Sequence, residues 1–249
     1  MSSHRMEILA LMAAVAAWGC DPVSPTTAGG AGAPPSLSQK VANPPFDDAA
    51  FVSRVTNPYL FLVPGTVYHY RSETPEGLET NIVTVTSAHK EILGVSTTVV
   101  HDQVFLEGEL SEDTFDWYAQ DTEGNVWYFG EDSREIEEGQ VVSTEGSWIA
   151  GEGDNEPGII MLAHPKVGVA YRQEIAPDVA EDMARVMSLK TSAEVPYGSF
   201  DGCVETMEWS LIEHGVRERK TYCPGVGLVL EDQPRNGHIQ NELVSITLP

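Results

Sequence analysis

The chain has 249 residues, of which 38 are acidic and 14 are basic, so its formal net charge is −24 at pH 7. Nucleic-acid binding needs Lys and Arg to neutralise phosphates, and this balance argues against a nucleic-acid partner. It also argues against an anionic membrane surface as a partner, other than through a covalent anchor. The charge suits solubility outside the cell, and the alternative is that acidic loops bind a divalent cation.

The N-terminus predicts export. An apolar run at residues 8–18 follows a short polar start and ends at Gly19-Cys20-Asp21. We expect a signal peptide at 1–19, a lipid-attachment site at Cys20 and a flexible tether at 20–45. The apolar run is shorter than the roughly 20 residues that span a membrane. The protein would be lipid-anchored in the cell envelope, outside the cytoplasm.

Cleavage by a plain signal peptidase is the alternative for this segment. The residue before Gly19 is Trp18, which fits a lipoprotein signal poorly, and Ala14-Val15-Ala16 offers another cleavage site. A cut there would leave Cys20 free and the protein secreted.

Two further cysteines predict a disulfide. After Cys20 only Cys203 and Cys223 remain, and an even pair in an exported protein favours a bond between them. A turn near 213–215 would fold one strand back on the next and bring the two cysteines opposite each other. Bridging requires their Cβ atoms to lie about 3.5–4.5 Å apart.

Residues 46–249 are expected to form a single β domain. Runs rich in Val, Thr and aromatic residues alternate with Gly, Asp and Asn clusters, which is typical of strands. The clearest runs are 80–87, 95–106, 114–120 and 126–129. Helical periodicity is nearly absent. Residues 47–55 could form a short helix, and residues 179–187 fit either a helix or a strand.

The spacing of glycines and aromatics predicts an internal duplication, with copies at about 60–150 and 163–248. Gly65 and Gly168 occupy similar segments, and matching landmarks further along keep an offset of 103 or 104 residues. Each copy would be an antiparallel meander, and two meanders remove their exposed edges by closing on each other. The predicted fold class is all-β: an antiparallel barrel, half-barrel or sandwich built from two duplicated β-meander halves.

A dense group of aromatic and acidic residues between 101 and 148 is the candidate site. In an open barrel mouth, aromatics could bind an apolar or sugar-like ligand while carboxylates orient it. The plain alternative is an ordinary hairpin with tryptophans in the core and carboxylates on the solvated face. The predicted ligand-binding residues are Trp117, Tyr118, Trp127, Tyr128 and Trp148.

Paired carboxylates could also act as acid and base, one of them with a raised pKa beside the tryptophans. The catalytic candidates are Asp116, Glu131, Glu145 and His101. We expect the 116–131 hairpin to line the pocket rather than its counterpart at 220–232, because the acidic and aromatic residues belong to one half only.

Familiar catalytic and metal motifs are missing from the sequence. It contains no Gly-x-Ser-x-Gly elbow, no His-Glu-x-x-His, no twelve-residue calcium loop and no phosphate-binding glycine loop. The histidines lack ligand spacing, so neither a metal nor a cofactor is expected. Loop 151–158 carries oxygens that suit calcium, but flexible acidic linkers are commoner.

Two parts of the chain resemble known exported proteins. Segments 195–203 and 222–229 resemble a motif pair found in many exported bacterial β proteins. Segment 116–132 is more closely similar to one uncharacterised family of exported bacterial β-rich lipoproteins. The resemblance covers roughly residues 55–248 and implies a fold of the broad lipocalin or lipoprotein-carrier kind, without catalytic residues.

The sequence therefore predicts an envelope lipoprotein that binds a small apolar or amphiphilic ligand and meets the membrane through its lipid anchor alone. One alternative is a carboxylate-dependent enzyme acting on a glycan or small molecule. Another is a structural or partner-binding envelope protein.

Overall fold

The computed structural model describes residues 43–213, 215, 217–233 and 239–249. The predicted signal peptide, Cys20 and most of the tether lie outside the described residues. Within them, no helix has the length and apolar character needed to cross a membrane. The elements are η1 (Asp48–Ala50), β1 (Phe51–Val52), β2 (Val67–Thr74), β3 (Gly77–Ile92), β4 (Val95–Leu106), β5 (Glu109–Asp121), β6 (Val126–Asp132), β7 (Glu135–Glu137), β8 (Gln140–Ser143), β9 (Trp148–Ile149), β10 (Glu156–Met161), β11 (Ala170–Arg172), β12 (Glu174–Ile175), β13 (Asp182–Val195), β14 (Gly198–Ser210), β15 (Glu218–Cys223), β16 (Gly227–Gln233) and β17 (Ile239–Thr247).

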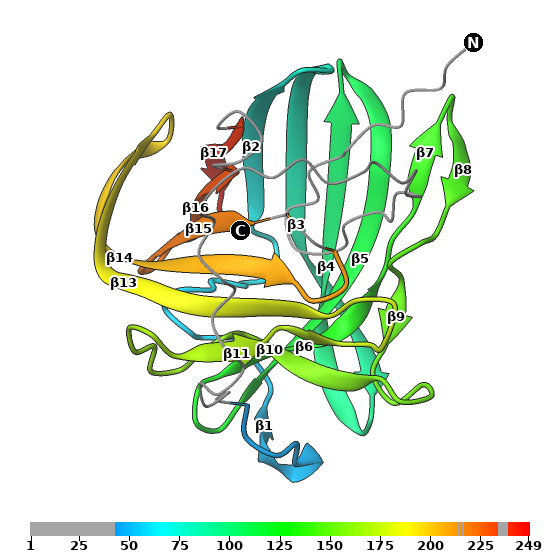
Figure 1. Ribbon diagram of the computed structural model, residues 1–249, viewed down its shortest axis with the longest axis vertical. Coiled ribbons are helices and arrows are strands. Elements are labelled where there is room, and N and C mark those ends of the chain that lie inside the picture. Colours follow the sequence, from blue (N-terminus) through cyan, green and yellow to red (C-terminus); the bar gives the residue numbers. More distant parts are fainter. Residues whose placement is uncertain (1–42, 214, 216, 234–238) are drawn as a thin grey trace, which may run out of the picture.

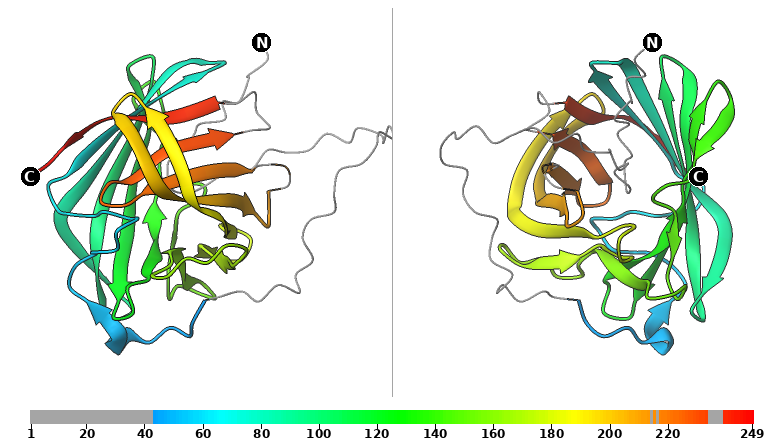
Figure 2. Two further views of the ribbon diagram at one scale, coloured as in Figure 1. Left: turned by 90° about the vertical axis from the view of Figure 1, so that its left-hand side faces the viewer. Right: turned by 45° about the vertical axis from the view of Figure 1, so that its right-hand side comes forward.

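The strands form one antiparallel sheet that curls into a nearly closed barrel. From β2 to β6, and again from β13 to β17, each strand pairs with the next. β17 pairs with β2, and β10 pairs with both β6 and β12, so the two meanders meet on both sides. Figure 1 shows β2–β5 as one wall, with β13–β16 running across the other side. Figure 2 shows the curved sheet from two further directions. The predicted all-β antiparallel fold is confirmed.

The two meanders begin with the same backbone geometry. Gly65 and Gly168 have φ angles of +93° and +86°, a region that glycine enters without strain. The N–H of Gly65 donates to the carbonyl of Val85 at 2.7 Å, and that of Gly168 donates to the carbonyl of Val186 at 2.8 Å. These matches agree with the predicted duplication, which itself stays a prediction.

One end of the barrel is closed by residues 55–62, which we call the closing segment. Gln120, at the end of β5, holds this segment through its side-chain Oε1. That oxygen accepts the backbone N–H of Thr56 at 2.7 Å and that of Asn57 at 2.8 Å. The Asn57 side chain in turn donates to the carbonyl oxygens of Gly124, in the turn between β5 and β6, and of Leu162, just after β10.

The closing segment covers an apolar end of the barrel. Beneath it lies a cavity of about 20 Å³, with room for about one water molecule. A cavity of this size is too small for an organic ligand. Its lining consists of Leu60, Phe61, Leu62, Tyr68, Tyr70, Val83, Gly227 and Leu228.

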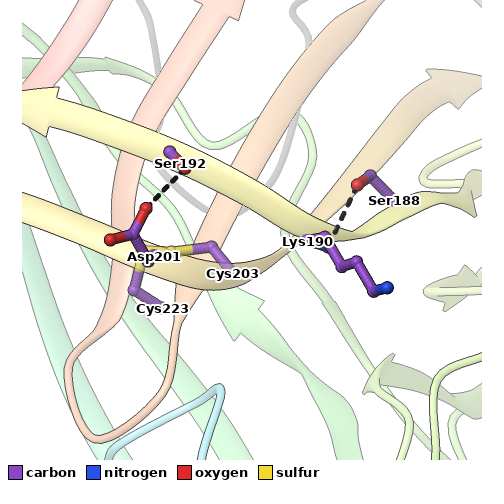
Figure 3. The surroundings of a disulfide bond; sticks show 6 residues. All are labelled: Ser188, Lys190, Ser192, Asp201, Cys203 and Cys223. Atoms are coloured by element: carbon purple, nitrogen blue, oxygen red, sulfur yellow. Dashed lines mark hydrogen bonds between the residues drawn. A yellow bond between two sulfur atoms is a disulfide. The ribbon is translucent and has the colours of Figure 1, made fainter.

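The predicted disulfide between Cys203 and Cys223 is confirmed. Val204 on β14 pairs with Tyr222 on β15, which brings the two cysteines side by side on neighbouring strands. Figure 3 shows the bond together with a hydrogen bond of 2.6 Å from the Ser192 hydroxyl to Asp201. Both sulfur-bearing side chains are fully buried.

The N-terminal part of the domain differs in detail from the sequence-based expectations. Within 47–55 only Asp48–Ala50 is helical, as a single 3-10 turn, because Phe51–Val52 pairs with the end of β5 instead. Residues 179–187 run into β13 and are largely strand. Asn43, inside the predicted tether, exchanges two hydrogen bonds with the backbone of Arg172, at 2.9 and 2.8 Å.

Candidate functional site

Six polar side chains form one row across the barrel interior, which we call the polar row. Each member pairs directly with the next on the neighbouring strand. None is more than 6% exposed. Because successive side chains of a strand point to opposite faces, a paired row with this burial lies on one face, the inside of the barrel. From β14 to β3 the members are Thr206, Lys220, Glu231, Asn241, Ser72 and Glu79.

Lys220 is surrounded by three carboxylates. Its Nζ lies 3.3 Å from Glu208, 3.4 Å from Glu218 and 3.9 Å from Glu231. We call these four residues the Lys220 cluster. Burial alone would lower the pKa of Lys220. The three neighbouring carboxylates raise it by more, so the pKa lies well above its ordinary value. Among the buried residues of the described ranges, Lys220 is the one Lys or Arg.

A second group of carboxylates comes from β5, β6 and β12 and contains no basic residue. Asp116 and Glu131 are directly paired across β5 and β6, and Glu174 joins them from β12. We call these three residues the acidic triad; all are buried. Burial, followed by the charges of Glu174 and Asp116, raises the pKa of Glu131 well above its usual range. Trp148 links the three groups: it pairs with Glu131 across β6 and β9, meets Tyr128 edge-on, and its side chain neighbours that of Glu174.

The acidic triad has several oxygens without a hydrogen-bond donor in the described part of the chain. They are both carboxyl oxygens of Glu131, Oδ2 of Asp116 and Oε1 of Glu174. A buried polar atom without a partner costs about 1–3 kcal/mol, and native proteins contain few of them. Within the described ranges, the polar row has further buried atoms without a hydrogen-bond partner, on Ser72, Glu231 and Asn241, but the triad is the group that consists of acids alone.

Gly130 turns Glu131 toward the interior. The pairing of β6 with β5 shifts by one residue between Tyr128 and Glu131, as in a β-bulge. Gly130 adopts a φ of +117° there, and a Cβ atom would lie 2.2 Å from the carbonyl oxygen of Trp148. Simple alternation from the inward-facing Tyr128 would place Glu131 on the outer face, so the bulge reverses its direction.

Aromatic rings cover one side of the acidic triad. The rings of Tyr118 and Tyr128 stack with centroids 4.9 Å apart, and Trp148 meets Tyr128 edge-on at 5.6 Å. The Tyr128 hydroxyl donates to Asp116 Oδ1 at 2.7 Å. Burial raises the pKa of Asp116 to about 7, although the hydrogen bonds from Tyr128 and Tyr118 act in the opposite direction.

More carboxylates face the same space. Burial raises the pKa of Glu112 to about 7 and that of Asp182 to about 6, and it raises that of Asp102 well above the usual range. Asp102 accepts a hydrogen bond from Asn81. We call the part of the interior that these groups line the acidic half. Its lining residues are Glu79, Asp102, Glu112, Asp182, the acidic triad and the Lys220 cluster.

The structure brings together five of the residues predicted from the sequence. Tyr118, Tyr128, Trp148, Asp116 and Glu131 all meet in the acidic half. The predicted site residues all belong to the first half of the chain, whereas the polar side chains that line the barrel interior come from both halves.

Two predicted ligand-binding tryptophans lie on the outer face instead. The ring of Trp117 lies under the ammonium group of Lys90, 3.3 Å from the ring centroid. Trp127 packs against Phe46 and Phe51, and its indole N–H donates to Asp121 at 2.8 Å. Trp127 is covered by the N-terminal segment and Trp117 by the side chain of Lys90 from β3, so both rings support the barrel wall.

Two predicted catalytic residues also lie apart from the acidic triad. His101 Nε2 is 2.7 Å from Asp113 Oδ1 on the outer face, and its ring stacks on Phe115 with centroids 4.2 Å apart. Glu145 is exposed in the turn after β8, where its backbone N–H donates to the hydroxyl of Ser143. Neither side chain can act together with Asp116 and Glu131.

The sequence-based analysis missed Glu174, Glu208, Glu218 and Glu231 as members of the site. Glu174 belongs to a strand of two residues, which gives no periodic signal. Lys220 lies between Glu218 and Tyr222 on an alternating strand, a pattern that could have indicated a buried lysine. No group of three His, Cys, Asp or Glu side chains in the described ranges has the arrangement of a metal site.

Comparison with known proteins returns similar structures and no related sequence. No protein-family model matches the chain, and no curated protein matches it either. One similar structure, from Bacteroides fragilis NCTC 9343, is described as an exported protein with a YmcC-like fold. It has 14% identity and a TM-score of 0.46, covering 80% of this chain and 100% of that one. Another, from Parabacteroides distasonis ATCC 8503, is described as a lipoprotein, with 11% identity, a TM-score of 0.41, and coverage of 80% and 99%.

Proposed function

We propose that this chain is a ligand-binding protein of the cell envelope, anchored through Cys20, whose barrel holds the polar head of a small amphiphilic molecule in its acidic half. The observation that carries the proposal is the set of buried carboxyl oxygens of the acidic triad that lack a donor. Buried polar groups normally find partners, and perturbed carboxyls gathered in one place are typical of binding and catalytic sites.

The lining favours an amphiphilic ligand over a purely apolar one. The apolar end of the barrel is filled by side chains and the closing segment, and its cavity of about 20 Å³ excludes an organic molecule. The acidic half instead offers hydrogen-bond acceptors beside stacked aromatic rings. A ligand with donor groups and some apolar surface matches both features.

Native mass spectrometry of the full-length protein, purified from its own envelope, tests this proposal. We expect a bound small molecule whose occupancy falls in the Glu131→Gln/Glu231→Gln double variant. The exposed Glu91→Gln on β3 is the control and should keep the ligand. Wild-type protein that carries no small molecule, in preparations that retain other envelope ligands, would overturn the binding function.

Carboxylate catalysis is a second candidate, favoured by the different surroundings of two paired carboxyls. Asp116 accepts a hydrogen bond from Tyr128 at 2.7 Å, whereas Glu131 has no hydrogen-bond donor in the described part of the chain. Unequal environments separate the pKa values of an acid and a base, as glycan hydrolysis requires. Incubation with envelope glycans should then release products that Asp116→Asn does not release; equal product from both proteins would exclude this role.

A further inference from the structure

The two halves of the barrel carry matching polar pairs at matching places. Asp116 pairs with Glu131 across β5 and β6, and Lys220 pairs with Glu231 across β15 and β16. Asp116 and Lys220 are 104 residues apart, which is the offset of the predicted duplication, whereas their partners Glu131 and Glu231 are 100 apart and match through the strand pairing. Each pair has further carboxylate neighbours, among them Glu174 beside the first pair.

The difference between the two places is one ammonium group. In the Lys220 cluster, Nζ lies 3.3–3.9 Å from three carboxylates. At the matching place of the first half a carboxylate replaces the lysine, and the acidic triad holds three acids without a cation. Among the described residues, oxygens of Asp116, Glu131 and Glu174 lack a hydrogen-bond donor there. Both carboxyl oxygens of Glu231 in the Lys220 cluster lack one too, but one of them has the ammonium charge 3.9 Å away.

Removing the charge imbalance requires either protons or an added cation. Neighbouring buried carboxylates cannot all ionise unless a positive charge joins them. The second half shows which kind of cation this interior accepts, because Lys220 places an alkylammonium group among three acids. A primary ammonium carries three N–H donors, one for each carboxylate of the triad.

We propose that the acidic triad binds the ammonium group of a primary amine ligand, in the position that corresponds to Lys220 Nζ in the other half. The ligand's apolar part would lie against the rings of Tyr128 and Trp148, whose faces also attract a cation. A quaternary ammonium fits poorly because it has no N–H to donate. The assignment rests on the proposed binding function and specifies the chemistry of the ligand's head.

Isothermal titration calorimetry with n-hexylammonium chloride tests the assignment on the full-length protein. Wild type should show saturable binding at pH 7.5, and Glu131→Gln should bind at least about tenfold more weakly. The controls with the same alkyl chain, n-hexanol and n-hexyltrimethylammonium, should bind weakly or not at all. The exposed control Glu91→Gln should bind n-hexylammonium as wild type does. A second variant, Glu131→Lys, would supply the ammonium from the chain itself and should abolish binding while raising the melting temperature.

Several results would overturn the assignment. They are no binding of n-hexylammonium to wild type, equal binding to wild type and Glu131→Gln, equal binding of n-hexanol, and displacement of the amine by calcium ions. The first three results bear only on the ammonium site. The proposed binding function is tested separately, by the native mass spectrum of the envelope-purified protein. A bound ligand without an amino group in that spectrum would keep the binding function and exclude the ammonium site.

Discussion

Lys220 and Glu231 lie opposite each other on β15 and β16, with the ammonium nitrogen 3.9 Å from a carboxyl oxygen that is sealed from solvent. Burial and the charge of Glu218 raise the pKa of Glu231, whereas the charge of Lys220 lowers it. One lysine therefore compensates several acids inside the barrel, and the stability of the second half depends on it.

Replacing Lys220 with Met should lower the free energy of unfolding by about 3–5 kcal/mol at pH 7, because a buried ion pair that loses one partner leaves uncompensated charge. Urea denaturation followed by tryptophan fluorescence measures this change. The exposed Lys166→Met is the matched control and should change stability by less than about 0.5 kcal/mol. A loss below 1 kcal/mol for Lys220→Met would show that the cluster is not a net source of stability.

Because the pKa of the Asp116 carboxyl group is raised, we expect the barrel to become more stable in mild acid. Its pKa is about 7 in the folded protein against an ordinary value of 3.8, so the folded state retains a proton that the unfolded state loses. The contribution is fully present below about pH 4 and is lost as the pH rises to 7, at up to about 1.4 kcal/mol per pH unit. Asp116→Asn should flatten this dependence in urea titrations at pH 5, 6 and 7; an unchanged slope would contradict the assignment.

Gln120 should be essential for the closing segment. Gln120→Leu removes the acceptor of two backbone N–H groups, those of Thr56 and Asn57, and each unpaired buried group costs about 1–3 kcal/mol. We expect faster amide hydrogen exchange at residues 55–62 and a clear loss of stability. The exposed Gln140→Leu on β8 serves as control, and similar exchange in both variants would argue against this role.

The disulfide should stabilise the second half. Cys203→Ala opens a loop with a sequence separation of 20, for which chain entropy gives about 3 kcal/mol. Chemical denaturation with and without reductant should show the same loss in wild type and none in the variant. Alkylation of the unreduced, unfolded wild type should label neither Cys203 nor Cys223.

The predicted lipid anchor at Cys20 lies outside the described residues and is tested on the mature N-terminus. Intact mass should show a diacylated Cys20, and the protein should fractionate with membranes. Cys20→Ser should release soluble protein or leave the precursor uncut. An unmodified N-terminus at another residue would indicate plain signal-peptidase cleavage, the alternative noted at Ala14-Val15-Ala16.

The fold was predictable because its signals are local. Alternating strands and paired glycines such as Gly65 and Gly168 follow from backbone geometry that each segment carries by itself. Strand alternation puts Asp116 and Trp117 on opposite faces of β5. It does not say which of them faces inward, since both are buried: Asp116 in the barrel interior, and Trp117 beneath the Lys90 side chain on the outer face.

The acidic half was less predictable because it depends on contacts between distant segments. Glu131 faces inward only through the bulge at Gly130, which pairing with another strand creates. Glu174 reaches the triad from a strand of two residues that pairs with β10. The lipocalin-like part of the resemblance stays a prediction.

The pairing of β17 with β2 also constrains when this protein can fold. Val67 pairs with Thr247 close to the C-terminus, so the first wall keeps an unpaired edge until the final strand is available. A chain made N-terminus first exposes this edge before β17 exists, and an exposed strand edge invites pairing with other chains. Long-range strand pairing is also intrinsically slow. We therefore expect residues 67–74 to need protection from aggregation until β17 is available, and truncations that remove β17 to aggregate rather than form a smaller barrel.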